Sequence, residues 1–329
     1  MSRFTQLSEK TGNLSPAVKP TYEYVLFPLP LLQEVFKDPQ NGFRTLQGMG
    51  IYTAAGSFVT TTESALKQAV YCFYKGGLNK SLQHYFDLMV KEGIFEPDYE
   101  YTGFTHKNHF DPDVDMEIIL EKMGGNHDFM QELSIFHRLR QAQKSFRVSF
   151  NIDSIQEIVN KCEGRYDFSN QPMVSVKREI LAEYQRRNPT VHEKMLFLGY
   201  AGIKSIIGNK EFAVTTREMI LCRMFGTSKP EFLENTLKDK RLREVYDKYS
   251  RRYQMEKILN ELVARSFVSS KLGYNRRTYV SCKLDYDQLS SRIIKEVKEK
   301  SINHTIKTNK IKELEMKKKI FRHLNKSTS

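Results

Sequence analysis

One segment constrains the fold of this chain most, because the spacing of its apolar side chains changes part-way along. It comprises residues 250–284, SRRYQMEKILNELVARSFVSSKLGYNRRTYVSCKL. The first half has apolar residues at helical spacing, at Met255, Ile258, Leu259, Leu262 and Val263. From Val268 onward, apolar and polar residues alternate on both sides of the turn sequence at 273–275. This pattern predicts an amphipathic helix, with Ser250 as its N-cap, that leads directly into a β-hairpin.

The predicted helix and hairpin carry basic and polar residues away from the apolar stripe. At about 100° per residue, Tyr253, Lys257 and Asn260 fall on the face opposite the stripe. Arg251 and Arg252 occupy the first turn, where positive charge is unfavourable unless an external anion such as a DNA phosphate lies nearby. We therefore expect DNA to contact Arg251, Arg252, Tyr253, Gln254, Lys257 and Asn260 on the helix and Lys271, Arg276 and Arg277 on the hairpin. The alternative is an ordinary α+β domain whose arginines only face solvent.

The overall charge favours a polyanionic partner. The chain has 329 residues, with 52 Lys and Arg against 39 Asp and Glu, and a net charge of +13. The excess is concentrated at the C-terminus, where residues 292–329 include 12 basic and four acidic residues. This segment either binds phosphates or acts only as a solubilising end. A hydrophobic fraction of 40% is typical of a folded protein with two or three domains.

The cysteines and the N-terminus indicate a cytoplasmic protein. Cys72, Cys162, Cys222 and Cys282 lie far apart and form no CxxC pair, so we expect free thiols in a reducing compartment. The N-terminus lacks the apolar core of a signal peptide, and no apolar run has the length of a membrane span. We expect no membrane partner.

A weak internal repeat predicts two helix-turn-helix units. Residues 59–66 and 214–221 are similar, and the first copy contains a Thr60–Glu63 capping box. A helix beginning near Asn79 repeats the apolar stripe of the helix after Ser250, and the second unit has 18 extra residues at 227–249. In the first unit the groove-facing equivalents are Lys80, His84 and Asp87, of which Asp87 is unfavourable next to phosphate. We expect Lys80, Ser81 and His84 to form a secondary DNA contact, unless this unit serves dimerisation.

No motif in the chain predicts catalysis. His106 and His109 have the wrong spacing for the metal site of nicking enzymes, and the acidic residues at 111–117 are typical of a helix start. The segment 199–205 is not a phosphate loop, because Ile203 separates Gly202 from Lys204. We therefore expect no enzyme activity, no cofactor and no metal.

With these features the chain resembles the tandem winged-helix replication initiators of plasmids and other mobile elements. Two segments carry the resemblance. They are FPLPLLQEVF before the first unit and SRRYQMEKILNELVARSFV in the second. It implies a mainly α fold with small β-hairpin wings, in which two winged-helix domains are joined by a helical connector. The expected parts are a flexible arm at 1–20, a first winged-helix-like domain at 21–105, a connector at 106–190, a second winged-helix DNA-binding domain at 191–290 and a basic helix or tail at 291–329.

The resemblance also implies a function. We expect a sequence-specific double-stranded DNA-binding protein that binds repeated origin sites and recruits host replication proteins, with a homodimer as one arrangement. Its recognition helix would enter the major groove, and Arg276 and Arg277 would contact the adjacent minor groove or backbone. Two alternatives are a transcriptional regulator of a mobile element and a helical interaction protein that does not bind DNA.

Overall fold

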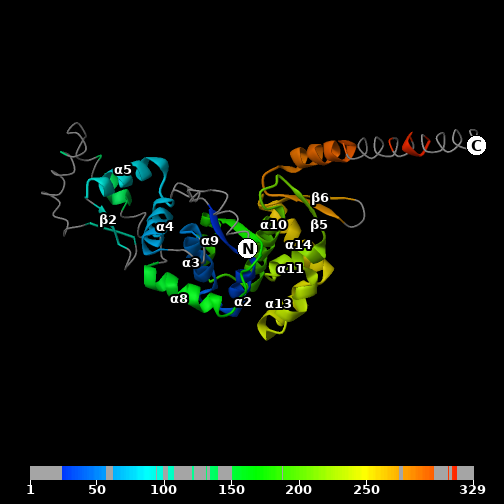
Figure 1. Ribbon diagram of the computed structural model, residues 1–329, viewed down its shortest axis with the longest axis horizontal. Helices are drawn as coiled ribbons and strands as arrows, with labels where there is room; N and C mark the ends of the chain where they lie inside the picture. Colours follow the sequence, from blue (N-terminus) through cyan, green and yellow to red (C-terminus); the bar gives the residue numbers. More distant parts are fainter. Residues whose placement is uncertain are drawn as a thin grey trace, which may run out of the picture.

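The computed structural model of the protein describes residues 24–56, 62–93, 95–98, 103–106, 134–139, 150–186, 188–273 and 277–299, with single residues at 121, 131 and 310 and the segment 313–316. The arm predicted at 1–20 and most of 107–149 lie outside these residues. The described chain is mainly helical with small antiparallel sheets. Along the long axis, helices α4 (Glu63–Lys75) and α5 (Lys80–Lys91) lie near one end and helix α14 (Arg252–Ala264) lies toward the other (Figure 1).

Two strands that are distant in sequence form the sheet nearest the centre of the molecule. Strand β1 (Tyr24–Pro28) pairs antiparallel with strand β4 (Met173–Lys177). Val25 and Phe27 of β1 are buried opposite Val176 and Val174 of β4, as alternation along a half-buried strand requires. The described part of the predicted connector therefore packs into the same core as the first unit, and it is not a separate spacer.

Helices cover this sheet and extend the core to the second unit. After β1 come the short helices η1 (Leu29–Gln33) and α2 (Glu34–Lys37), then α3 (Gly42–Ala54), which packs on β1, on α8 (Ile152–Glu163) and on α9 (Arg178–Arg186). Phe43 of α3 stacks on Tyr184 of α9, with 5.4 Å between ring centroids. The same ring meets Phe197 edge-on at 5.0 Å, so one aromatic cluster joins α3 and α9 to the second unit.

The first unit continues through α4 and α5 into a hairpin of strands β2 (Phe95–Asp98) and β3 (Gly103–His106). Asn79 caps α5, because its side chain accepts a hydrogen bond from the Leu82 amide at 3.0 Å. Thr62 caps α4 by accepting from the Ala65 amide at 3.2 Å. The cap predicted at Thr60 is therefore wrong by two residues, and Thr60 itself lies outside the described residues.

The second unit has the same succession of elements with one more strand. Helix α10 (Val191–Ile207) is followed by strand β5 (Ala213–Thr215), helix α11 (Arg217–Met224), helix α14, and the hairpin of β6 (Ser269–Leu272) and β7 (Thr278–Ser281). These strands form one antiparallel sheet in the order β5-β7-β6. The hairpin is thus tied to the strand that precedes α11.

Helix α10 is the central support of the second unit. Most of its side chains are buried, and it packs on α11, α14 and β4. A Cβ atom at Gly199 would lie 3.0 Å from Ile258 Cγ2 and 3.1 Å from Leu262 Cδ1, so the missing side chain lets α14 approach closely. Residues 199–205 are helical, which agrees with the rejection of a phosphate loop there.

The 18 additional residues of the second unit fold as helices between α11 and α14. They form η2 (Pro230–Phe232), α12 (Leu233–Thr236) and α13 (Lys240–Tyr249), as the sequence predicted for an inserted helical segment. Helix α13 also contacts the first unit, where Arg241 Nη1 donates a hydrogen bond to the Lys37 carbonyl at 2.8 Å. The insertion therefore connects the two units as well as lengthening one of them.

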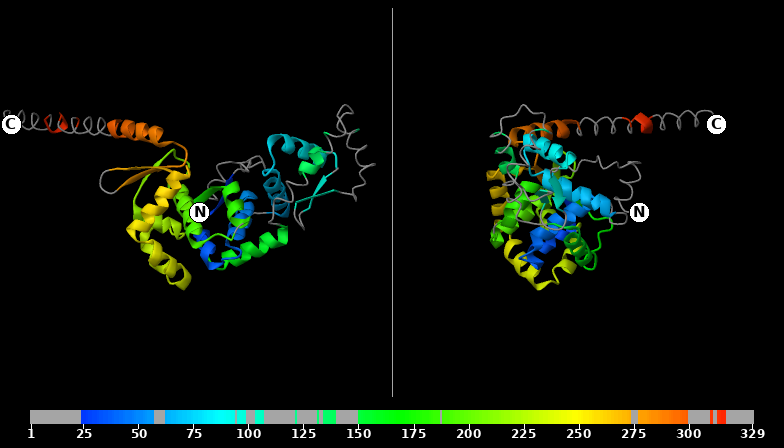
Figure 2. Two further views of the ribbon diagram at one scale, coloured as in Figure 1. Left: turned by 180° about the vertical axis from the view of Figure 1, so that it is seen from behind. Right: turned by 90° about the vertical axis from the view of Figure 1, so that its left-hand side faces the viewer.

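A further helix, 286–299, follows β7 and leads away from the body of the molecule (Figure 2). Leu289 and Ile293 face the body and are buried, whereas Ile294 and Val297 are exposed. Among the described helices, none combines the length and the apolarity needed to cross a membrane. All four cysteines are free thiols.

Candidate functional site

Helix α14 presents one apolar and one polar face, but the buried stripe is narrower than its sequence predicted, because Val263 is 39% exposed and Leu259 is half-buried. Met255, Ile258 and Leu262 are fully buried against the core. The start of the helix differs from the prediction, because Arg251 is the N-cap residue and its side chain makes no capping hydrogen bond. Ser250 instead ends α13, and its amide donates to the Tyr246 carbonyl at 2.8 Å. Because α13 and α14 are nearly continuous, Ser250 is the C-cap of the first helix, and the N-cap position of the second falls to Arg251.

The polar face of α14 is open to solvent. Tyr253 has 73% of its surface exposed, and Lys257 and Asn260 are also exposed, while Gln254 is half-buried. Tyr253, Lys257 and Asn260 fall on the face that helical geometry places opposite the buried stripe, whereas Gln254 lies at its edge. An exposed tyrosine, amide and ammonium supply the donors and acceptors that can contact the edges of bases or the phosphates of a nucleic acid.

The two arginines at the start of α14 differ in their surroundings. Both are exposed, but Arg252 Nε donates to Glu256 Oε1 at 2.7 Å, one turn further along the helix. This hydrogen bond raises the pKa of Arg252. The prediction treated Arg252 as a bare cation and missed Glu256, although its i, i+4 spacing was visible in the sequence. A phosphate at this position must compete with the Glu256 carboxylate.

The last turns of α14 are fixed to the first turn of α10. His192 Nε2 lies 2.8 Å from Glu261 Oε2, and Arg265 Nη2 donates to Glu261 Oε1 at 2.6 Å. The His192 ring also stacks on Tyr249 of α13. The hydrogen bond with His192 is the main reason that the pKa of Glu261 is lowered. These contacts orient α14. The Glu261–Arg265 pair has an i, i+4 spacing that is visible in the sequence, whereas the contact with His192 could not be predicted because the two residues are far apart in the chain.

The hairpin places its predicted basic residues in different surroundings. Arg277 is exposed, whereas Arg276 lies outside the described residues. Lys271 is half-buried, and its Nζ donates to Ser290 Oγ of the helix 286–299 and lies over the Tyr286 ring. The Gly273 amide donates to the Arg277 carbonyl at 2.8 Å to close the turn. The hairpin therefore offers Arg277 to a partner, while Lys271 is engaged with the molecule itself.

The equivalent surface of the first unit lies on α5. Leu82, Phe86 and Met89 are buried, and the three residues predicted for a secondary contact, Lys80, Ser81 and His84, are exposed. Asp87 accepts hydrogen bonds from the Tyr71 hydroxyl at 2.6 Å and from Lys75 Nζ. This carboxylate is thus paired within the protein, which reduces its repulsion of a nearby phosphate.

The described residues contain no group of three or more His, Cys, Asp or Glu that could hold a metal ion. The acidic residues considered at 111–117 lie outside the described part of the chain. Comparisons of this chain with protein-family models, with curated proteins and with solved structures found no match.

Proposed function

We propose that the second unit is a winged helix that binds double-stranded DNA, with α14 in the major groove and the β6–β7 hairpin as the wing. The observation that carries this proposal is the order of its elements. Helix α10, strand β5, helix α11, the inserted helices η2, α12 and α13, helix α14 and a hairpin follow one another, and the hairpin joins β5 in the sheet order β5-β7-β6. This arrangement resembles that of winged-helix domains, in which the last helix of the helix-turn-helix enters the groove.

The chemistry of the open surface supports the same proposal. Tyr253, Lys257 and Asn260 are the side chains of α14 that can reach base edges, because they lie opposite the buried stripe. Arg251 and Arg252 at the start of the helix, with Arg277 on the hairpin, are assigned to phosphates, and contacts to phosphates fix orientation without reading sequence. A net charge of +13 favours such contacts throughout the chain.

The further role that we propose is replication initiation, in which the protein binds iterated sites at an origin and recruits host replication proteins. Two units with the same helix, helix and hairpin succession support this role, because they give one chain two surfaces of the same kind at α5 and α14. A transcriptional regulator would share the surface of α14 and would bind a single operator.

Mobility-shift titrations test the proposed DNA-binding surface. They compare a selected duplex with a scrambled duplex over a range of salt concentrations. We expect Arg251→Ala with Arg252→Ala to weaken binding to both duplexes and to flatten the dependence of log K on log salt by about one to two units. Lys257→Ala and Asn260→Ala should instead reduce the preference for the selected duplex, by about 1–3 kcal/mol each.

The matched control carries Lys229→Ala with Lys240→Ala, which removes two exposed charges outside the proposed surface. It should leave the affinity for both duplexes close to that of the unmodified protein. Equal affinities for the Arg251/Arg252 variant and this control would reject α14 as the DNA-binding element.

A further inference from the structure

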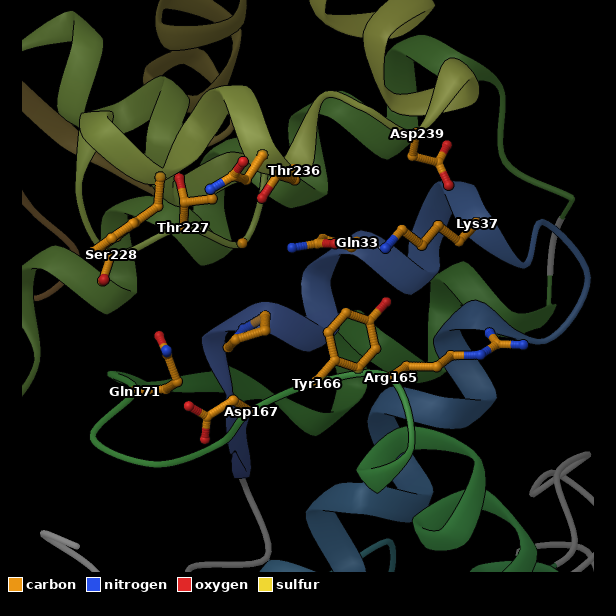
Figure 3. Close-up of a pocket in the computed structure, with 14 residues that line it drawn as sticks. Gln33, Lys37, Arg165, Tyr166, Asp167, Gln171, Thr227, Ser228, Thr236 and Asp239 are labelled. Carbon is orange, nitrogen blue, oxygen red and sulfur yellow. Dashed lines mark hydrogen bonds between the residues drawn. The ribbon is translucent and has the colours of Figure 1, made fainter.

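A polar cleft of about 500 Å³ lies where the inserted segment of the second unit meets α2 (Figure 3). Its walls come from three separate parts of the chain, which are η1 and α2, the loop at 165–171, and residues 226–239. Figure 3 shows Gln33 and Lys37 between the other two walls. The volume is within the range of small-molecule sites, roughly 300–1,000 Å³.

Lys37 is the central cation of the cleft. Its Nζ donates to Gln33 Oε1 at 2.8 Å and lies 5.0 Å from the centre of the Tyr166 ring. Burial lowers the pKa of Lys37, although the nearby carboxylates of Asp239 and Glu34 act in the opposite direction. An ammonium group has three N–H bonds, so this one retains donors for a ligand, and an anion would offset its desolvation.

A second cation, Arg165, lies on the wall formed by the loop at 165–171. Arg165 Nη1 lies 3.5 Å from Oε1 of the fully buried Glu34, and the Tyr166 hydroxyl donates to the same oxygen at 2.6 Å. Glu34 thereby contacts two side chains of this wall, while about half of the Arg165 side chain stays exposed. A guanidinium that contacts a carboxylate through one terminal nitrogen and is half exposed keeps other N–H groups that can bind a phosphate or carboxylate.

The acidic residues that line the cleft have structural roles. Asp167 Oδ1 accepts from the Ser169 amide at 2.8 Å. Asp239 Oδ1 caps α13 by accepting from the Arg241 and Leu242 amides. Amide and hydroxyl side chains complete the lining, at Gln171, Thr227, Ser228, Asn235 and Thr236. The amide and hydroxyl groups of the lining can therefore donate hydrogen bonds to a ligand. Phe232, which is 51% exposed, adds an apolar surface to the wall at 226–239.

We propose that this cleft binds a small phosphorylated molecule of nucleotide size, with its phosphate between Lys37 and Arg165. The proposal does not depend on DNA binding, because ligand binding is measured in the absence of a duplex. The inserted residues that distinguish the second unit from the first supply one wall, at Phe232, Asn235 and Thr236. The insertion would then form a ligand site in addition to joining the two units.

Isothermal titration of the full-length protein with pyrophosphate, AMP and adenosine tests the site. We expect pyrophosphate and AMP to bind, and adenosine to bind at least tenfold more weakly than AMP. Lys37→Met and Arg165→Gln should each weaken AMP binding at least tenfold, while Lys229→Met, which changes an exposed lysine outside the lining, should leave it unchanged. Thermal melting of each variant shows whether it is folded.

The Arg165 variant could fail to fold, because the change removes a neighbour of the buried Glu34. A further variant tests the site in that case. Asn235→Asp changes an exposed lining residue and should weaken AMP binding by adding negative charge. The proposal is overturned if neither phosphate compound binds, if adenosine binds as well as AMP, or if the folded lining variants match Lys229→Met. Competition by duplex DNA for the pyrophosphate site would assign the cleft to a nucleic-acid backbone and would also overturn it.

Discussion

Glu256 is the residue that most limits the positive charge at the start of α14. Its carboxylate accepts from Arg252 Nε at 2.7 Å, and both side chains are exposed. Because solvent screens such a pair, its geometry is easily rearranged when a stronger anion arrives. We infer that Glu256 restrains binding to phosphates at random positions and makes the base contacts proposed for Lys257 and Asn260 more decisive.

Replacing Glu256 by Gln should strengthen binding to both selected and scrambled duplexes and reduce the ratio between them. With Arg252 released, the salt dependence should steepen by up to about 0.9 in log–log slope, the value for one additional phosphate contact. Fluorescence-anisotropy titrations at several salt concentrations measure both effects. Glu244→Gln on α13 is the control, since it removes an exposed carboxylate from another helix; weaker binding by the Glu256 variant would contradict the inference.

Glu261 gives a prediction for stability against pH. Its pKa is lowered below the ordinary 4.5, mainly by the hydrogen bond with His192. A lowered pKa means that the carboxylate stabilises the folded state above pH 4.5 and that this contribution is lost as the pH falls through the folded-state value. We therefore expect Glu261→Gln to have a lower melting temperature than the unmodified protein at pH 6, and the difference to shrink toward pH 3. A difference that stays constant over this range would exclude the assigned role.

At the level of single elements, local pattern predicted the helix α14 and its hairpin, although two apolar side chains of the predicted patterns, Val263 and Leu272, are exposed. The buried stripe at Met255, Ile258 and Leu262 follows from spacing alone, since one face of a helix must be covered. The cap at Ser250 was wrong because α13 continues to that residue, and a sequence pattern does not reveal where two consecutive helices meet. The engagement of Lys271 with Ser290 was missed because it depends on where a later helix packs.

The approach of α14 to α10 depends on Gly199. Gly199→Val should force Ile258 and Leu262 away from α10 and destabilise the protein by about 1–3 kcal/mol, the usual cost of overpacking a core. Chemical denaturation followed by circular dichroism measures the loss. Adding Leu262→Ala to Gly199→Val should cost less than the sum of the two single changes, because the smaller side chain makes room. Strict additivity would show that the two positions do not compete for the same space.

For the whole molecule, the mainly helical class and the helical insertion were predictable, but the joining of the units was not. Pairing of β1 with β4 leaves no local signature, because the two strands are separated by most of the first half of the chain. The cleft around Lys37 was equally invisible, since its walls come from three separate segments. The periodicity of apolar residues predicts which face of an element is buried, but it does not predict which distant element covers that face.

Selection of bound fragments from the DNA around the gene for this chain distinguishes the proposed roles. We expect enrichment of several copies of one short sequence, because an initiator binds iterated sites. A single enriched operator would favour the regulator instead. If no fragment is enriched at low salt, where phosphate contacts are strongest, sequence-specific DNA binding itself is rejected.

Because α10 rests on β4 as well as on α14, the second unit shares structural support with the rest of the protein. Transplanting that unit as a cassette between related proteins would expose apolar surface on both donor and recipient. Retargeting by exchanging only the solvent-facing side chains of α14 would leave that support intact. If α14 binds DNA as proposed, altered specificity is therefore better pursued by exchanging its surface side chains than by exchanging the whole unit.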